Sequence, residues 1–405
     1  MKFSKLSQLF LVTSIGLIVA SLLTACQLVT IDYVFVGASA GTSAGSAGQI
    51  FTYAVDSQSG ALRTAAPTVS SGGTLPVAMA VSPDYANLYV ANEGNNSVVH
   101  FAIANNGVLT QKDSITLPAA PVSLAVNSTG TYLYVVSGTT PYGSLTEYAL
   151  SSGAIGSPTA TQSLSLSSYP SDTIVPTGVN VLANGNAVYV CAYDISAYNP
   201  GGNTTSNNSQ PGWLFGYAVG SGGALTALTN SPYQAGVKPS AVASDPTNRF
   251  VYVTDFATND LIGYTVQAGS SLIFMLNGPF KTGNQPTAVT VDPRGFYIYL
   301  ANSLDSTVSG YTISLPTGTP SGVVGASSTA GNTTDTHPVA IIVDPSLARF
   351  VYTANYLGNT VSGFRLDTDT GALSVTQATP YPTGANPAAL AAVPHGNYAI
   401  QKVTP

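Results

Sequence analysis

Short apolar runs recur along the chain, and each is followed by a turn and then by a run that contains Tyr and Val. One such unit spans residues 76–84, 88–92, 97–101 and 107–109. Runs of this length that are rich in Val and Tyr and bounded by Gly, Pro, Asn or Asp are typical of β-strands. Each unit therefore predicts three clear strands, with a fourth, poorly marked strand after a Gly-x-Leu turn.

The same unit repeats through most of the sequence. Its closest copies begin at Pro239, Pro286 and Pro338, and weaker copies begin at Pro121 and Pro176. Successive starts lie between 45 residues apart (from 76 to 121) and 63 residues apart (from 176 to 239). Repeats of this length with four short strands are typical of the blades of a β-propeller.

The two ends of the repeat region are incomplete in complementary ways. A partial unit at 33–36, 50–53 and 60–62 lacks its first strand, and a lone first strand stands at 386–391. Pairing of these two segments would close the ring and remove its exposed sheet edges. Six full units and one shared unit predict an all-β fold, a seven-bladed propeller in which the C-terminal strand completes the N-terminal blade.

The composition excludes several other classes. Only 7% of the residues are charged while 44% are hydrophobic, which is the reverse of a disordered chain. Glu occurs only at positions 93 and 147, although helical bundles are rich in Glu, Lys and Arg. The 11 basic residues are outnumbered by 17 acidic ones, which argues against a nucleic-acid partner.

Residues 1–25 have the pattern of a signal peptide. Lys2 and Lys5 precede an apolar run over residues 9–23, which is shorter than the ~20 residues of a spanning helix. The sequence Leu-Thr-Ala-Cys that ends at Cys26 resembles the lipobox of bacterial lipoproteins, and this resemblance implies lipidation of Cys26. Gln27 resembles the sorting signal for the outer membrane. We therefore expect a signal peptide at 1–25, a lipidated tether at 26–31 and the propeller at 32–405, held at the cell envelope by the lipid alone.

The second cysteine, Cys191, lies in the apolar segment 187–192. No His is close to it in sequence, whereas a reactive thiol needs a nearby base and partial exposure. We interpret Cys191 as a small core residue. With Cys26 lipidated, no disulfide framework is expected.

The repeated pattern Pro-x-x-x-x-Val-x-Pro, Tyr-Val-x-Asn and Gly-x-Leu over residues 32–393 resembles the seven-bladed lactonase family, which includes 6-phosphogluconolactonase-like enzymes, and surface propellers with YVTN repeats. The resemblance implies a channel lined by His, Arg and Glu, with an Arg-His pair after the first-strand Pro of one blade. This chain has no such pair. Arg249, Arg294 and Arg349 fall at turns and are predicted to be solvated on the face opposite any pocket, so a phosphate clamp is not expected.

The long links at 157–175, 194–212 and 316–337 are predicted to share one face of the disc, the usual place for function. The residues before each first-strand Pro should surround the channel mouth on this face: Leu75, Ala120, Val175, Lys238, Gln285, His337 and Asn386. The second strands end there at Asn92, Asp255, Asn302 and Asn355, with Glu93 and Asp305 beside them. His337 with Glu93 or Asp255 is a candidate general-base pair. Lys238, Gln285, Asn386 and the strand-end Asn residues are candidate ligand-binding groups, and the alternative is that strand-end Asn and Asp only make turn hydrogen bonds.

These observations favour a monomeric, lipid-anchored binding module whose long-loop face takes an envelope protein or a polar carbohydrate. The alternative is a hydrolase of a sugar-type or other uncharged lactone at the channel mouth, and a structural role is a third possibility. No cofactor, metal or nucleic acid is expected. Two further polar residues, His100 and Glu147, occupy equivalent positions in neighbouring units and predict an inter-blade contact. His395 is expected to be exposed.

Overall fold

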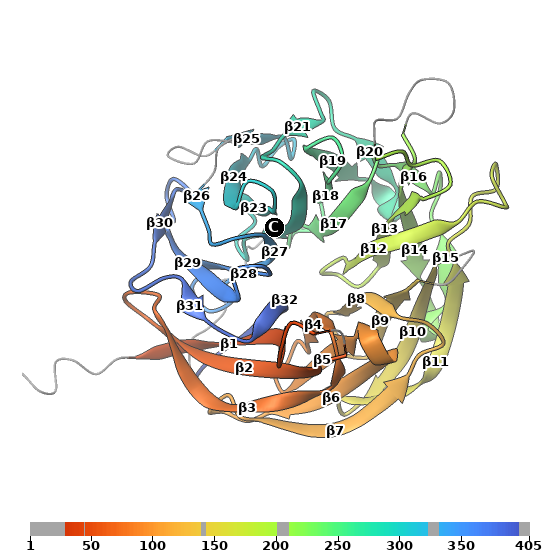
Figure 1. The fold of residues 1–405 in the computed structure, drawn as a ribbon. Coiled ribbons are helices and arrows are strands. Elements are labelled where there is room, and N and C mark those ends of the chain that lie inside the picture. The colour runs from red at the N-terminus through yellow and green to blue at the C-terminus, as the bar shows by residue number, and fades with distance from the viewer. Residues whose placement is uncertain (1–28, 44, 139–142, 201–209, 323–331, 397–405) are drawn as a thin grey trace, which may run out of the picture.

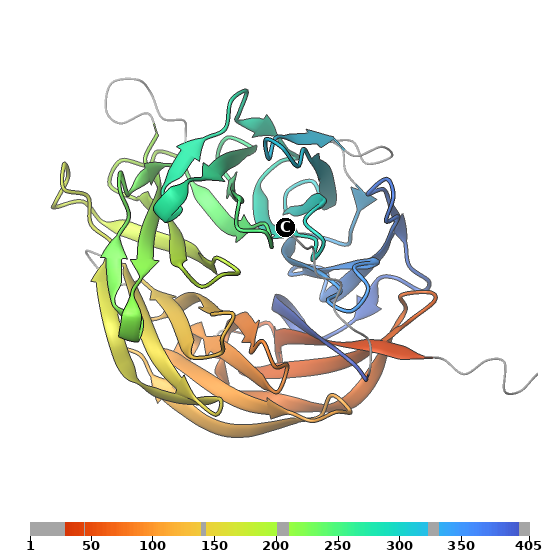
Figure 2. The same cartoon turned by 180° about the vertical axis from the view of Figure 1, so that it is seen from behind.

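The computed structural model describes residues 29–396 apart from 44, 139–142, 201–209 and 323–331. Seven antiparallel sheets surround one axis (Figures 1 and 2), as the repeats predict. The predicted signal peptide and Cys26 lie outside the described residues, as does part of the long link at 194–212. No helix in the described part of the chain is long and apolar enough to cross a membrane.

The first three blades each have four strands. From the axis outward, the first blade has β32 (Ala385–Pro394), β1 (Thr30–Ser39), β2 (Ala47–Asp56) and β3 (Leu62–Thr74). The second has β4 (Pro76–Val81), β5 (Asn87–Asn92), β6 (Ser97–Ile103) and β7 (Leu109–Thr116). The third has β8 (Pro121–Val126), β9 (Tyr132–Ser137), β10 (Ser144–Ser151) and β11 (Ala154–Ser163). A short 3₁₀ helix, η1 (Glu93–Asn95), links β5 to β6.

The other four blades have a broken outer strand, so that two short strands pair with the third one. The fourth blade has β12 (Ile174–Val181), β13 (Ala187–Asp194), β14 (Gly212–Val219), β15 (Leu225–Ala227) and β16 (Tyr233–Gln234); the fifth has β17 (Pro239–Ser244), β18 (Phe250–Asp255), β19 (Asp260–Val266), β20 (Leu272–Phe274) and β21 (Phe280–Lys281). The sixth has β22 (Pro286–Val291), β23 (Tyr297–Asn302), β24 (Thr307–Ile313), β25 (Pro320–Gly322) and β26 (Asn332–Thr333); the seventh has β27 (Pro338–Val343), β28 (Phe350–Asn355), β29 (Thr360–Leu366), β30 (Leu373–Val375) and β31 (Tyr381–Pro382). The 3₁₀ helices η2 (Ser221–Gly223) and η3 (Ala268–Ser270) lie in two hairpin turns.

The ring closes as predicted. The C-terminal strand β32 pairs antiparallel with β1, from Asp32 opposite Pro394 to Ser39 opposite Ala385. This pairing supplies the inner strand that the first blade lacks in the sequence, so that β1 is paired on both sides. Cys191 is fully buried in β13, and burial raises the pKa of its thiol to about 12, in keeping with a core residue.

Buried tyrosines on the second strands join neighbouring blades. The hydroxyl group of each donates a hydrogen bond to a turn carbonyl in the next blade: Tyr89 to Gly153 (2.7 Å), Tyr189 to Ser270 (2.6 Å), Tyr252 to Gly318 (2.7 Å), Tyr299 to Gly371 (2.6 Å) and Tyr352 to Gly60 (2.8 Å). Burial raises the pKa of these phenols above the usual range, so they remain donors. Because a buried carbonyl without a partner is costly, this bond fixes each seam.

The same turns also pack against aromatic rings. Five turn glycines with positive φ meet an aromatic side chain of the preceding blade: Gly60 meets Phe350, Gly107 meets Tyr33, Gly223 meets Tyr132, Gly318 meets Phe250 and Gly371 meets Tyr297. A Cβ on Gly318, for instance, would lie 2.3 Å from Cδ1 of Phe250. The seam between the second and third blades differs, because Gly153 meets Asn87 there.

The predicted contact between His100 and Glu147 is not formed. His100 pairs instead with Asp113 of its own blade, and the buried Glu147 accepts a hydrogen bond from Thr159, with burial raising the pKa of its carboxyl. The reason lies in the outer strands, since each of these side chains turns toward the continuous fourth strand of its blade. In the fourth and fifth blades, Gly stands at this position and the apolar side chains of Leu228 and Met275 fill the space.

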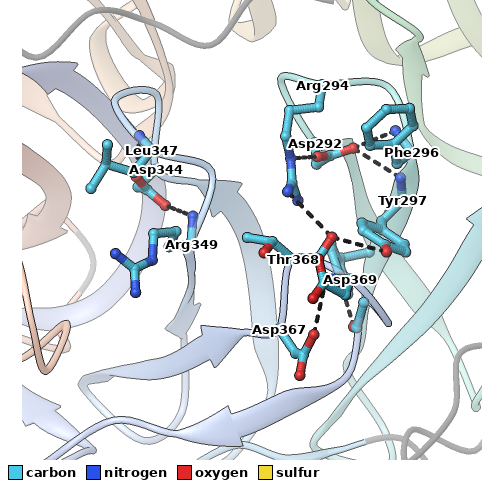
Figure 3. A network of polar contacts seen from close by, with 12 residues as sticks. Asp292, Arg294, Phe296, Tyr297, Asp344, Leu347, Arg349, Asp367, Thr368 and Asp369 are labelled. Carbon is cyan, nitrogen blue, oxygen red and sulfur yellow. Dashed lines mark hydrogen bonds and ion pairs between the residues drawn. The ribbon is translucent and has the colours of Figure 1, made fainter.

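Arg294 is only 9% exposed and is not the solvated residue that the sequence predicted (Figure 3). Its Nε donates to Asp292 at 2.8 Å, and its Nη1 reaches the Thr368 carbonyl of the seventh blade at 3.4 Å. The hydroxyl of Tyr297 donates to the same carbonyl. Arg294 therefore joins two blades. Arg249 is exposed, as predicted, but it too reaches a carbonyl of the next blade, that of Leu315.

Two buried carboxyl groups face each other where the last blade meets the first. Asp344 begins a turn of the seventh blade and accepts hydrogen bonds from the backbone N–H groups of Leu347 and Phe350. Asp32 of β1 is fully buried beside it and accepts a hydrogen bond from the Ser346 hydroxyl. Burial, and then the charge of Asp344, raises the pKa of Asp32 well above its usual range. The ring is therefore closed next to a carboxyl whose pKa is raised by folding.

Candidate functional site

The residues before the first-strand prolines lie at one end of the channel together with the ends of the second strands. In each of five blades the carbonyl of the pre-proline residue accepts a hydrogen bond from the chain just after the second strand: Leu75 from Glu93, Ala120 from Gly138, Lys238 from Phe256, Gln285 from Ser303 and His337 from Tyr356. These residues form the face that we call the mouth.

The mouth residues are also held by the blade before them. The N–H of Gln285 donates to Oδ1 of Asn259 (2.8 Å), and that of Asn386 donates to Oδ1 of Asn359 (2.9 Å). The N–H of His337 donates to the Ser306 hydroxyl at 3.3 Å. The structure thus arranges Lys238, Gln285, His337 and Asn386 on four consecutive blades around the mouth.

The strand-end amides and Asp255 point into the blades. Asn92, Asn302, Asn355 and Asp255 are all fully buried. The amide of Asn355 donates to Thr360 and Ser362, and that of Asn302 donates to Thr307 and Ser309 of its own blade. The amide of Asn92 donates to the Ser71 carbonyl of β3 in the preceding blade. The Asp255 carboxylate accepts hydrogen bonds from the backbone N–H groups of Val237, Lys238 and Ala257. These four side chains stabilise turns, which was the alternative interpretation of the sequence.

His337 does not pair with either predicted acid. Among the described residues, no hydrogen bond or ion pair joins it to Glu93 or Asp255, because Asp255 is enclosed by its own turn and Glu93 lies two blades away. Glu93 is exposed on η1. The half-buried His337 imidazole lies edge-on to Tyr356, with ring centroids 6.4 Å apart, and has no hydrogen-bond partner among the described residues. Its ring nitrogens are therefore available to hydrogen-bond a ligand.

Lys238 is held by aromatic rings rather than by a carboxylate. Its Nζ lies 4.8 Å from the ring centroid of Phe256, 5.2 Å from that of Tyr198 and 5.4 Å from that of Tyr193. Such cation–π contacts stabilise the ammonium charge. No acidic side chain in the described part of the chain forms an ion pair with Lys238, so its charge remains available to an anionic group.

A pocket of about 340 Å³ opens beside this lysine, between the fifth and sixth blades. Aromatic rings line one side of it and amide or hydroxyl groups line the other: Tyr198, Phe256, Thr258, Asn259, Asn284 and Gln285, with Leu304 at the rim. No ionisable acid or base is among its described lining residues apart from the Tyr198 phenol. Such a surface suits a neutral ring that carries hydroxyl groups.

The channel itself offers little chemistry. The cavity at its centre has a volume of about 290 Å³ and is lined by the inner strands, mainly by small apolar residues such as Ala78, Ala241, Ala340 and Ala389, with the hydroxyl groups of Ser123, Thr177, Ser240 and Thr287. The last three donate their hydrogen bonds to the backbone, as Ser240 does to Pro286. The reactive groups are therefore those of the mouth.

Sequence analysis missed the aromatic residues of the mouth. Phe256 and Tyr356 directly follow the last residue of a second strand, Asp255 and Asn355, and the chain has Glu93 and Ser303 at the same repeat position. Aligning the repeats one residue beyond the strand would have revealed this variable position. Tyr198 carried no signal, because it lies in a long loop without a counterpart in the other blades.

The chain belongs to the seven-bladed β-propeller lactonase family, whose model matches residues 28–120 and 104–401. The lactonase resemblance of the sequence is thereby confirmed. No curated protein sequence matches the chain.

Solved structures share the fold at low sequence identity. A putative 6-phosphogluconolactonase from Bacteroides uniformis has a TM-score of 0.72 at 15% identity, covering 90% of this chain and 100% of that one. The periplasmic gluconolactonase of Pseudomonas aeruginosa has a TM-score of 0.71 at 17% identity, covering 90% and 99%. Hydrazine synthase of Kuenenia stuttgartiensis has a TM-score of 0.57 at 18% identity, covering 80% and 93%. These similarities concern the fold.

Proposed function

We propose that this propeller hydrolyses an uncharged, sugar-type lactone at its mouth. The observation that carries this proposal is the pocket beside Lys238, in which aromatic rings face amide and hydroxyl groups. Membership of the lactonase family supports the reaction class, and the gluconolactonase of P. aeruginosa is one structural neighbour. The absence of Arg and Lys from the described pocket lining, which Lys238 only adjoins, favours a neutral substrate over a phosphorylated one.

The reaction assigns separate tasks to the two free polar groups. His337 would take a proton from water as its oxygen attacks the lactone carbonyl carbon. The carbonyl oxygen then becomes an oxyanion, which the Lys238 ammonium would stabilise. When the ring C–O bond breaks, the leaving alkoxide takes up the proton, and the hydroxy acid product ionises and releases one proton to the solution. His337 belongs to the blade next to the pocket and is held by Ser306, two residues beyond Leu304 of the pocket rim.

The test uses the chain without residues 1–26 and follows proton release from glucono-1,5-lactone at constant pH. We expect turnover above the spontaneous rate. His337→Ala should lower kcat by about a hundredfold or more because the base is lost, and Lys238→Met should lower kcat by about a hundredfold because the oxyanion loses its cation. Lys238→Arg should retain part of the activity.

Glu93→Ala is the matched control, because Glu93 is an exposed residue of the mouth that has no contact with the pocket. It should leave kcat unchanged. Equal rates for the native chain and His337→Ala, with both shown to be folded by circular dichroism, would contradict the proposed role of His337. No turnover by the folded native chain would contradict the proposed function as a whole.

Non-catalytic binding is the second candidate function. Its support is the apolar rim of the mouth, where Leu304 is 62% exposed and Leu357 is 57% exposed. The partner would be an envelope protein or a polar carbohydrate. If the lactone assay shows no turnover, binding of envelope extracts that Leu304→Ser and Leu357→Ser both abolish would support this function.

We also propose that the protein is a lipoprotein of the outer membrane that is held there by Cys26 alone. The support is the lipobox-like sequence before Cys26 and the Gln that follows it. Metabolic labelling with a fatty acid should mark the native chain but not Cys26→Ser. A labelled Cys26→Ser variant, or a native chain without label in the soluble fraction, would contradict this anchor.

A further inference from the structure

A cavity lies on the face opposite the mouth, between the turns of the second and third blades. Figure 2 shows the molecule from behind relative to Figure 1. The volume of the cavity is about 710 Å³, within the usual range for small-molecule sites. The turn between β4 and β5 forms one wall, and the hairpin turn between β10 and β11 forms the other. No residue of this cavity belongs to the proposed lactone site.

At this seam, Asn87 replaces the aromatic residue that five other seams have at the same repeat position. At five other seams an aromatic ring fills the space beside the turn glycine of the next blade, as Phe250 does at Gly318. Here Asn87 stands at that position beside Gly153. The smaller amide leaves room for the cavity, so the repeats themselves show which side chain would close it.

The amide that replaces the aromatic ring belongs to a chain of polar contacts. Asn87 donates from Nδ2 to the Ser82 hydroxyl (3.3 Å), and its Oδ1 faces Nε2 of His100 at 2.8 Å. On the other side of the ring, Nδ1 of His100 lies 2.9 Å from Oδ2 of Asp113. The imidazole is 3% exposed and stacks on Tyr89 with ring centroids 5.2 Å apart. Burying these hydrogen-bonded polar side chains costs more desolvation free energy than burying the aromatic ring that five other seams have at the position of Asn87. The polar side chains therefore point to a role other than stabilising the fold.

Two carboxyl groups, Asp84 and Asp113, and two basic groups, Lys112 and His100, line the cavity. The ring nitrogens of His100 lie beside Oδ1 of Asn87 and Oδ2 of Asp113. Lys112 and Asp84, both exposed, contribute one charge of each sign. A ligand that matches this cavity is therefore neutral.

The cavity combines oxygen acceptors with apolar walls. Asp84 is exposed at the cavity and holds its own turn through Oδ1, which accepts from Ser82 and the Ala86 N–H. Ile103 and Ala154 supply apolar surface beside it. Hydroxyl groups on an apolar ring satisfy both kinds of surface. We propose that this inter-blade cavity is a second binding site, that it takes a neutral sugar ring, and that Asp84 and Asp113 accept hydrogen bonds from the sugar hydroxyl groups.

The test titrates the chain without residues 1–26 with methyl α-D-glucopyranoside, methyl α-D-galactopyranoside and methyl α-D-mannopyranoside, followed by saturation-transfer NMR. We expect saturable binding of at least one of them. Asp84→Asn should weaken that binding by about tenfold, because a charged acceptor is lost at an exposed position that the fold tolerates. Asn87→Phe, which installs the ring found in the other seams, should abolish it.

Phe256→Ala removes the sugar-stacking surface of the mouth, so glycoside binding that remains in this variant belongs to the inter-blade cavity. Asp84→Asn should leave lactone turnover unchanged. This second comparison separates failure of the second site from failure of the proposed hydrolase. The inference is overturned if none of the three glycosides binds, or if binding survives both Asp84→Asn and Asn87→Phe. It is also overturned if D-glucosamine or D-gluconate binds more tightly than the neutral glycosides, because the site would then select a charge.

Discussion

Replacing Asp32 with Asn should stabilise the ring closure at neutral pH. Asp32 is fully buried next to Asp344 and accepts a hydrogen bond from the Ser346 hydroxyl. Asn is nearly isosteric. Its Oδ1 can still accept from Ser346, and its Nδ2 can donate to the Asp344 carboxylate, which the charged form of Asp32 can only repel. The variant therefore keeps the packing and removes the titration.

The magnitude follows from linkage between protonation and folding. The pKa of Asp32 is raised in the folded chain, so the folded state binds more protons than the unfolded state above pH ~4. The stability that the protonated Asp32 contributes is complete below pH ~4, and it falls by about 1.4 kcal/mol per pH unit until the folded pKa is reached. The Asn variant has no such loss. The difference between the two chains should therefore be close to zero near pH 4 and should grow as the pH rises, by at most about 1.4 kcal/mol per pH unit, in favour of Asp32→Asn.

Urea unfolding at pH 4, 5, 6 and 7, followed by tyrosine fluorescence, measures both free energies. Titrating groups that do not interact with Asp32 cancel in the difference, because the two chains share them. Asp344 does not cancel, because its charge interacts with that of Asp32. The reasoning is refuted if the two stability curves run parallel across this range, or if Asp32→Asn becomes less stable than the native chain as the pH rises.

Three further predictions concern the interior. Tyr252→Phe should lower the free energy of unfolding by about 1–2 kcal/mol in urea titration, because the Gly318 carbonyl loses its donor; an unchanged midpoint would contradict the seam bond. Gly318→Ala should lower the free energy of unfolding by at least about 3 kcal/mol, because the φ of Gly318 is +75° and the new Cβ would meet Phe250. Gly222 has a similar φ of +70°, but a Cβ there would have no atom within 4 Å, so Gly222→Ala should lower the free energy of unfolding by only about 1 kcal/mol. Equal losses for the two glycines would mean that the ring contact is unimportant. The thiol of Cys191, with a pKa of about 12, should not react with a thiol reagent in the folded chain at pH 8 and should react fully in urea.

The fold was predictable because each repeat contains the same signals. The Pro that begins each inner strand, the Tyr of each second strand and the turn glycines follow one another in the same order in every complete unit. The complementary ends of the repeat region predicted closure by β32, which the pairing of β1 with β32 confirms. Most strands of a propeller pair with strands that are neighbours in the sequence. The alternation of side chains along each strand and the turn residues between strands therefore suffice to predict most of the pairings.

The site was less predictable, because it depends on where side chains point. The sequence placed Asp255 at the mouth, but the backbone N–H groups of Val237 and Lys238 turn its carboxylate inward. The sequence likewise treated Arg294 as solvated, although it spans a seam to the Thr368 carbonyl. Both outcomes depend on contacts between residues that are distant along the chain or on loop conformation, which periodicity does not encode.

The central claim is that the mouth hydrolyses a neutral lactone. Its most direct test compares proton release from glucono-1,5-lactone and from 6-phosphoglucono-1,5-lactone by the same folded protein, with Phe256→Ala alongside. We predict a kcat/KM for the neutral lactone at least about tenfold above that for the phosphorylated one, and a loss of about tenfold in Phe256→Ala as the sugar ring loses its stacking surface. Preference for the phosphorylated lactone, or turnover that Phe256→Ala leaves unchanged, would contradict the account.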